Sequence, residues 1–239
     1  FLDYISINKI DLTKLKSIIK GILKGCKQSG CQLVGGETAE MPGTYEKGKF
    51  DIAGFAVGVV DGKKILGKNK IKLNDLVIAI PSSGLHSNGY SLIRYLIKKK
   101  KINIKNNNFL KKELLKPTKI YVQELLQLIN KNLINGCANI TGGGIPDNIK
   151  RVIPNNLIAE INLNKIKTLK IFKWLKKNGI SDKEMLQTFN CGVGFCLIIN
   201  PRKYRKIARY FTRGFKPYII GRITKGKEKV KLNGSFKWI

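Results

Sequence analysis

Two carboxylates, Glu37 and Glu40, stand three residues apart behind a pair of glycines, in a chain with 15 acidic residues against 46 basic ones. The glycines, Gly35 and Gly36, follow a short apolar run that reads as a strand, so we expect them to form a turn at its end. A carboxylate at that place suits Mg²⁺, which takes one or two protein oxygens and completes its shell with water and phosphate. The alternative is a helix N-terminus whose acidic residues complement the helix dipole.

The single histidine, His86, stands in a Gly/Ser-rich stretch at residues 81–92, between a predicted strand and a predicted helix. Such a turn offers backbone N–H groups to an anion. The imidazole can donate to a phosphate or transfer a proton near neutral pH. The alternative is an ordinary loop capped by serine or asparagine. We favour a functional site because the histidine occupies a Gly/Ser loop where a strand meets a helix.

A third stretch, residues 139–148, contains three consecutive glycines, Gly142, Gly143 and Gly144, directly after Thr141. Glycines let the backbone approach a ligand closely, and the predicted helix after them adds its dipole. The spacing matches neither a Walker loop nor a dinucleotide fingerprint. The stretch therefore indicates a phosphate site, with a tight packing turn as the alternative.

A fourth stretch, residues 184–195, presents Thr188 and Asn190 at the start of a predicted strand, where two glycines leave room for a ligand. Cys191 lies among them and could act as a nucleophile. No histidine or aspartate is near it in sequence, so a buried structural cysteine is the favoured interpretation.

The net charge of +31 could indicate nucleic-acid binding. The excess is mostly lysine, scattered through predicted helices and loops beside abundant isoleucine and asparagine, the three residue types that A/T-rich codons encode. Arginine clusters and aromatic residues interleaved on one face, typical of nucleic-acid binders, are missing from the sequence. We therefore expect no nucleic-acid partner, but a basic surface that attracts phosphorylated metabolites.

With 43% hydrophobic residues, the 239-residue chain can form one large or two modest packed domains. It has no run of 18 apolar residues and no N-terminal secretion signal, which favours a cytoplasmic protein without a membrane partner. We expect free, mostly buried thiols rather than a zinc site, because the cysteines include no Cys-x-x-Cys pair. The five are Cys26, Cys31, Cys137, Cys191 and Cys196.

Periodicity and turn signals predict alternating strands and helices. Strands are expected at residues 1–7, 32–34, 51–60, 76–80, 138–141, 157–163, 192–199, 218–224 and 229–232. Helices are expected from a cap at Asp11 or Thr13 to residue 27, at 90–99, 118–130, 145–152 and 169–177, from a Ser181/Glu184 capping box to 188, and at 201–212.

The predicted strand at 51–60 is almost wholly apolar and reads as buried on both faces. Residues 101–108 read as a loop, and the polar residues 61–74 as a linker between two domains. Some connections are too short for a parallel crossover. We therefore expect an α+β (mixed α/β) fold with two domains, each a mixed sheet covered by helices.

Five motifs, in order and at the expected spacing over nearly the whole chain, resemble the aminoimidazole ribonucleotide synthetase family, also called phosphoribosylformylglycinamidine cyclo-ligase. The motifs are LVGGETAEMPG (33–43), SSGLHSNGYSL (82–92), LKPTKIYV (115–122), ITGGGIPDN (140–148) and EMLQTFNCGVG (184–194). The resemblance implies that residues 1–66 are the C-terminal part of an N-terminal ATP-binding domain. Residues 67–239 would be the C-terminal substrate-binding domain.

The resemblance implies an ATP-dependent ligase of de novo purine biosynthesis. ATP phosphorylates the formyl oxygen of formylglycinamidine ribonucleotide, a nitrogen of the same substrate closes the ring, and ADP and phosphate leave. Such an enzyme need only align two substrates and neutralise phosphate charge. The resemblance also implies Mg²⁺ and a homodimer.

The resemblance assigns roles to individual residues. Glu37 would hold Mg²⁺ and, with Gly35, Gly36 and Thr38, the ATP. His86 and Asn88 would be catalytic, beside the transferred phosphoryl group or the substrate. The implied substrate- or phosphate-binding residues are Ser83, Gly84, Thr141, Gly142, Gly143, Gly144, Thr188 and Asn190.

The family carries a further segment ahead of the point that corresponds to Phe1. That segment holds a Thr-Asp-Gly-type loop, metal- and nucleotide-binding aspartates, and strands of a dimer barrel. We therefore expect the first domain to be incomplete and the 239 residues alone not to catalyse ring closure. One alternative is a non-catalytic remnant that needs a separate N-terminal piece. Another is a superfamily relative such as selenophosphate synthetase or thiamine-monophosphate kinase, which the HSNGYS and FNCGVG stretches disfavour.

Overall fold

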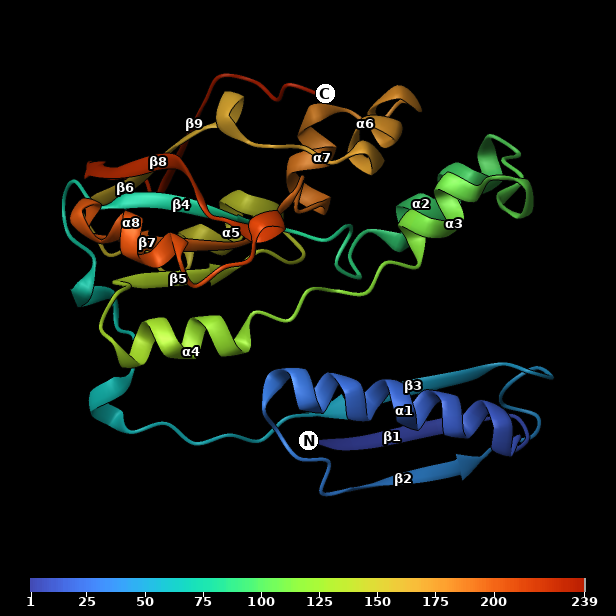
Figure 1. Ribbon diagram of the computed structural model, residues 1–239. Coiled ribbons are helices and arrows are strands. Elements are labelled where there is room, and N and C mark those ends of the chain that lie inside the picture. The colour runs from blue at the N-terminus through green and yellow to red at the C-terminus, as the bar shows by residue number, and fades with distance from the viewer. Residues whose placement is uncertain (239) are drawn as a thin grey trace. The chain divides into compact units, whose positions relative to one another are not determined.

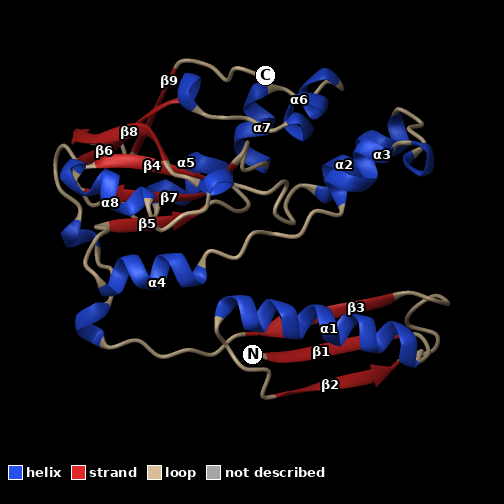
Figure 2. Cartoon of the chain, viewed as in Figure 1, coloured by secondary structure: helices blue, strands red, loops and turns tan. Residues whose placement is uncertain are grey.

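The computed structural model describes residues 1–238, which form two compact units (Figures 1 and 2). The first unit is Phe1–Ile65 with Ile120–Gln127, and the second is Leu66–Lys119 with the residues from Leu128 onward. The sequence predicted a division after residue 66, without the return of 120–127 to the first unit. Each unit contains a mixed sheet and helices, so the expected α+β fold with two sheets is confirmed.

The first unit is built on a three-stranded sheet in the order β2-β1-β3. Its elements are β1 (Leu2–Ile7), α1 (Leu12–Ser29), β2 (Gly35–Glu40) and β3 (Phe50–Phe55). β1 runs parallel to β2 and antiparallel to β3, and α1 provides the crossover that the parallel pair requires. The predicted cap of α1 is confirmed, because the Asp11 carboxylate accepts from the N–H groups of Thr13 (3.0 Å) and Lys14 (3.2 Å).

The predicted turn at Gly35 and Gly36 is wrong, because both glycines belong to β2 and pair with β1. Gly36 lies opposite Asp3, where any side chain would overlap the Asp3 carboxylate and carbonyl group. Pairing between the strands therefore explains this glycine better than turn formation does. Tertiary contacts have overridden the local turn signal.

The predicted strand at residues 51–60 is also partly wrong. β3 ends at Phe55, and all of its six residues are exposed rather than buried on both faces. The apolar residues that follow are more exposed still, with Val57 at 84%. An apolar run is buried only where another layer covers it, and β3 is an edge strand of its sheet.

The second unit contains a six-stranded sheet in the order β5-β7-β4-β8-β6-β9. Its strands are β4 (Leu76–Pro81), β5 (Gly136–Asn139), β6 (Leu157–Asn162), β7 (Val193–Ile199), β8 (Tyr218–Lys225) and β9 (Val230–Asn233). β6 and β9 are parallel, whereas the other neighbours are antiparallel. β4 is one of the two middle strands, and four of its residues are completely buried.

The remaining helices agree with the predicted positions at most places. They are α2 (Tyr90–Lys99), α3 (Asn108–Leu114), α4 (Val122–Asn130), α5 (Gly144–Lys150), α6 (Lys170–Lys177), α7 (Asp182–Thr188) and α8 (Tyr204–Ala208). Ser181 caps α7 as predicted, since its hydroxyl accepts from the Glu184 N–H at 3.1 Å.

One helix was not predicted, and two predicted helices were wrong in their extent. α3 begins where the sequence predicted a loop to end, because the Asn107 side chain accepts from the Leu110 N–H at 2.9 Å and starts the helix. α4 begins only at Val122, since the backbone ahead of it bonds to the loop after β4. The helix predicted at 201–212 is a 3₁₀ turn (Pro201–Lys203) followed by the short α8.

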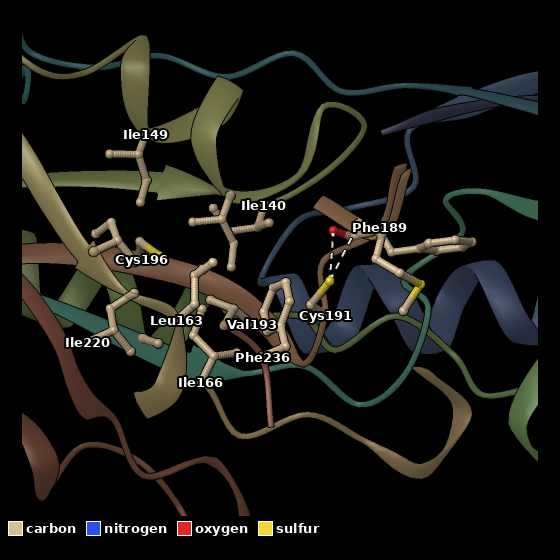
Figure 3. Close-up of a cluster of buried hydrophobic side chains, with 14 of the residues drawn as sticks. Ile140, Ile149, Leu163, Ile166, Phe189, Cys191, Val193, Cys196, Ile220 and Phe236 are labelled. Carbon is tan, nitrogen blue, oxygen red and sulfur yellow. Dashed lines mark hydrogen bonds between the residues drawn. The ribbon is translucent and has the colours of Figure 1, made fainter. Parts of the chain in front are cut away.

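The hydrophobic core of the second unit surrounds Phe172 and Phe189, both completely buried, with ring centroids 6.1 Å apart. Figure 3 shows part of this cluster, with Ile140, Val193 and Cys196 among its labelled members. Among residues 1–238, no helix has both the length and the apolar character needed to cross a membrane.

Replacing Phe172→Ala should lower the free energy of unfolding by about 3–5 kcal/mol, because the buried ring is lost and a cavity remains. Urea denaturation followed by circular dichroism measures the change. Leu115→Ala is the matched control: this side chain is 82% exposed, so its loss should cost under about 0.5 kcal/mol. Equal effects of the two substitutions would contradict the assignment of the core.

Candidate functional site

Four of the five motifs meet in the second unit, around the loop that follows β4. The Ser82 N–H of this loop donates to the Gly192 carbonyl at 2.9 Å. Asn88 Oδ1 lies 3.8 Å from the position that a Cβ on Gly142 would occupy, and the Phe189 ring packs directly on Gly89. Stretches far apart in sequence thus form one site.

Asn190 joins two of these stretches through its side-chain amide. Its Oδ1 accepts from the Ser82 hydroxyl at 3.0 Å and from the Gly192 N–H at 2.8 Å, and its Nδ2 donates to the Gly84 carbonyl at 2.9 Å. The residue is 0% exposed. A buried amide with its polar atoms paired in this way fixes the shape of the loop.

Thr188, the other polar residue of that motif, is half-buried at the end of α7. Its hydroxyl donates to Glu184 Oε1 at 2.6 Å, one helical turn earlier. The expected contact of Thr188 and Asn190 with a substrate stays a prediction.

The glycine loop at 142–144 is held from one side by Asn148. Its Nδ2 donates to the carbonyl groups of Gly144 (2.7 Å) and Gly142 (3.2 Å). Gly144 has φ +61°, and a side chain there would overlap the Leu186 carbonyl, so only glycine fits. Within residues 1–238, the N–H groups of Gly142 and Gly143 have no acceptor. Paired carbonyls and available N–H groups are what an anion requires.

His86 is buried, and its Nε2 accepts the Ser83 N–H at 3.0 Å, with the Lys119 N–H at 3.4 Å. A backbone N–H can only donate, so Nε2 carries no proton and the ring hydrogen lies on Nδ1. Burial lowers the pKa of His86 from 6.5 to about 4, so the ring is neutral near pH 7. Nε2 therefore organises the backbone and does not donate to a phosphate.

The motif at 115–122, together with Leu114 just before it, is partly a frame for this loop. The Ser83 hydroxyl donates to the Pro117 carbonyl and the Tyr90 hydroxyl to the Leu114 carbonyl, both at 2.7 Å. The sequence had given this motif no physical role. His86 and Ser87 have positive φ values, +53° and +61°, which are uncommon for residues with side chains. The hydrogen bonds from the frame hold this backbone in place.

Reasoning from the sequence missed Ser82 and Asn148 as residues that build the site. Both stand inside the motifs, and Asn148 follows the last glycine by four residues. An amide one helical turn into a helix is compatible with a surface position as well, so spacing alone could not reveal its bonds to the loop carbonyls. The structure supplies that information.

The expected nucleotide residues Gly35, Gly36, Glu37 and Thr38 lie in the first unit, along β2. Side chains alternate along a strand, so Glu37 and Thr38 project to opposite faces of the sheet. Glu37 is exposed. The second carboxylate of this motif, Glu40, accepts the Ile10 N–H at 2.6 Å and so holds the start of the α1 connection.

The described residues contain no cluster of three or more His, Cys, Asp or Glu side chains that could hold a metal ion. A single exposed carboxylate such as Glu37 can supply one ligand of Mg²⁺, whose other ligands are then phosphate oxygens and waters. The donor set thus fits a nucleotide-bound Mg²⁺ and not a metal site made by the protein alone.

The five cysteines are free thiols, as expected. Cys191 is completely buried beside Phe189 (Figure 3), and its Sγ donates to the Met185 carbonyl at 3.3 Å. Burial raises the pKa of the Cys191 thiol far above its usual value. The interpretation as a structural cysteine is therefore favoured over that as a nucleophile.

Comparison with solved structures defines the fold class. The structure matches thiamine-monophosphate kinase from Stenotrophomonas maltophilia with a TM-score of 0.64 at 16% identity, over 99% of this chain and 72% of that one. It matches the hydrogenase maturation protein HypE of E. coli with a TM-score of 0.64 at 13% identity, over 98% of this chain and 69% of that one. These likenesses establish a shared two-domain fold and nothing more.

Sequence comparison identifies the family. Residues 1–60 match the N-terminal domain and residues 72–233 the C-terminal domain of AIR synthase related proteins. This chain belongs to the AIR synthase family. It is 44% identical over 236 residues to a protein of Thermodesulfovibrio yellowstonii and over 242 residues to one of Bacillus cytotoxicus, both named phosphoribosylformylglycinamidine cyclo-ligase.

The alignments cover 95% and 98% of this chain, and 69% and 70% of those two relatives. A Neisseria meningitidis relative with the same name is 44% identical over 83% of this chain, and 59% of its own length is covered. By homology the chain is an ATP-using cyclo-ligase of purine biosynthesis. The family and the enzyme class expected from the sequence are thereby confirmed.

Protonation of His86 should destabilise the protein. Its folded pKa of about 4 lies below the ordinary value of 6.5, so the unfolded chain binds the proton first. The contribution of neutral His86 to the free energy of unfolding is complete above pH 6.5. It is lost as the pH falls towards 4, by at most about 3 kcal/mol.

His86→Gln is the matched variant, because its amide oxygen can accept the same N–H groups but does not titrate. Urea denaturation of both proteins between pH 7 and pH 4 measures the difference. We expect the wild type to lose more stability than the variant in this window. Parallel pH curves would contradict the neutral, accepting role of His86.

Proposed function

We propose that the protein carrying this chain acts in the cytoplasm and closes the imidazole ring of aminoimidazole ribonucleotide. The reaction consumes ATP and formylglycinamidine ribonucleotide. The observation that carries the proposal is the convergence of four family motifs on one site in the second unit. At that site the N–H groups of Gly142 and Gly143 are available to a phosphate.

The chemistry requires little covalent participation by the protein. The formyl oxygen of the substrate takes the terminal phosphoryl group of ATP, which releases ADP and leaves a phosphorylated imidate. The substrate's own nitrogen then attacks the activated carbon, phosphate leaves, and the nitrogen loses a proton. Catalysis of this kind rests on alignment and on neutralising negative charge.

In this proposal the glycine loop binds a phosphate of the substrate or the transferred phosphoryl group. Thr141 lies beside the loop, and Ser83 and Gly84 lie in the neighbouring stretch. Asn88, whose Oδ1 faces Gly142, is the side chain best placed to touch the reacting group. His86 acts through the loop that it holds, as a positioning residue. The net charge of +31 attracts both phosphorylated substrates.

Glu37 supplies a carboxylate for Mg²⁺ in this proposal, and the ion would offset negative charge on the ATP phosphates. The position of Glu37 on an exposed strand beside Gly35 and Gly36 leaves room for such a complex. Thr38 projects to the other face of β2, so a contact with the nucleotide from its backbone is favoured over one from its hydroxyl.

We also propose a homodimer, formed through β3 and the residues after it. Phe55, Val57, Val59 and Val60 are between 63% and 103% exposed, in one continuous run. Contiguous exposed apolar surface on an edge strand is typical of a protein interface. We propose that a second copy of the same chain covers this surface, because the family resemblance implies a homodimer.

The function is tested by ADP release from ATP in the presence of formylglycinamidine ribonucleotide, with the protein that carries this chain and with residues 1–239 alone. We expect substrate-dependent turnover by the former. Turnover of thiamine monophosphate instead would assign a related kinase. Absence of any nucleotide binding, with pairing to a separate N-terminal piece, would favour the non-catalytic remnant.

The same assay tests the glycine loop through Asn148→Asp, which places a carboxylate against the carbonyl groups that Nδ2 now binds. We expect kcat/KM to fall by about 100-fold or more, since roughly 3 kcal/mol of positioning is lost. Asn155→Asp is the control, because its exposed side chain accepts from Lys229 and an aspartate does the same. A loss below tenfold at Asn148 would contradict the proposed phosphate loop.

Val57→Asp together with Val59→Asp should convert the dimer into monomers, since burying two carboxylates at an interface is strongly unfavourable. Sedimentation equilibrium measures the mass. Leu12→Asp, at a 66% exposed position on α1, is the control and should leave the dimer intact. A wild-type protein that sediments as a monomer, or a double variant that remains dimeric, would disprove this interface.

A further inference from the structure

The C-terminal turn of α1 brings two cysteines together. Gly30 ends the helix in the left-handed conformation, with φ +73°. The N–H groups of Gly30 and of Cys31 both donate to the Cys26 carbonyl, the latter at 3.1 Å. In this type of helix end, the side chain after the glycine folds back onto the side chain five residues earlier. The two residues in those positions are Cys26 and Cys31.

The two cysteines are brought together by this turn, and the surroundings of their thiols differ. Cys26 is 6% exposed, whereas Cys31 is exposed to solvent. The Ser29 hydroxyl lies 3.1 Å from Cys31 Sγ. This hydroxyl also bonds to the Gly25 and Cys26 carbonyls, at 2.9 and 3.1 Å, and can turn to the sulfur when Cys31 ionises.

These surroundings separate the pair into an attacking and a resolving thiol. The hydrogen bond with Ser29 is the main cause that lowers the pKa of Cys31, and burial is the main cause that raises the pKa of Cys26. The three remaining cysteines, Cys137, Cys191 and Cys196, all have pKa values raised by burial. An exposed thiolate is the form that reacts with oxidants, so Cys31 should react first.

We propose that Cys26 and Cys31 are a reversible oxidation site, in which hydrogen peroxide converts the two thiols into a disulfide. The Cys31 thiolate attacks an oxygen of the peroxide: an S–O bond forms, the O–O bond breaks, and water leaves after protonation. The sulfur of Cys26 then attacks the sulfenic acid at Cys31: an S–S bond forms, the S–O bond breaks, and a second water leaves. Two thiols lose two electrons and two protons, and one hydrogen peroxide becomes two waters.

The fold favours this closure. The helix end already holds the backbone of residues 26–31 in a hydrogen-bonded return, so the disulfide closes a loop that is nearly formed. The remaining thiols lie in the second unit, outside this turn. A thiol reductant should open the bond and restore both cysteines.

The test treats the protein with hydrogen peroxide under native conditions, blocks free thiols with iodoacetamide, and measures intact and peptide masses. We expect one linked peptide pair containing Cys26 and Cys31, about 2 Da lighter than the sum of the two reduced peptides, and full reversal by dithiothreitol. Cys137→Ser is the matched control and should give the same linkage.

Variants separate the two roles. In Cys26→Ser no resolving thiol remains, so Cys31 should continue to the sulfinic acid, a gain of about 32 Da. In Cys31→Ser, Cys26 should still be unmodified when the wild-type pair is fully oxidised. A wild-type protein whose Cys31 is oxidised to the sulfinic acid without linkage to Cys26, or in which another cysteine pairs first, would overturn the proposal.

Discussion

A buried amide must find partners for its polar atoms, and this requirement shapes the second unit around Asn190. Its three hydrogen bonds tie the loop after β4 to the start of β7. Leaving one of these groups unpaired costs more than the bond itself contributes, so the loop has one favourable conformation. The His86 ring, the glycine loop and the Phe189 side chain take their positions relative to that loop.

Most side chains of the site therefore form hydrogen bonds to the main chain, and few of them are available to bind a ligand. Asn148 pairs the carbonyl groups of the glycine loop, and His86 accepts N–H groups from its own loop and from the segment at 117–119. What these bonds leave available are main-chain N–H groups. Main-chain donors suit a reaction in which the protein aligns phosphorylated molecules and supplies no nucleophile of its own.

The elements with strong local signals were predictable from the sequence. The Asp11 and Ser181 caps predict where α1 and α7 begin, because a cap is a hydrogen bond between residues close together in the sequence. The fold class and the family also followed from the motifs. Predictions failed where a distant partner decides the outcome: Asp3 places Gly36 inside a strand, and Ser83 with His86 delays the start of α4. The exposure of β3 depends on whether another layer of the structure covers it, and the local sequence pattern carries no information about that layer.

The order of strands in the larger sheet bears on how the chain folds during synthesis. β4 precedes both of its neighbours along the chain, because β7 and β8 come from residues 193–225. During synthesis β4 therefore cannot pair with either neighbour until residues 193–225 have also been made. Chains with such distant pairings fold slowly, and the apolar surface that they expose in the meantime is prone to aggregation.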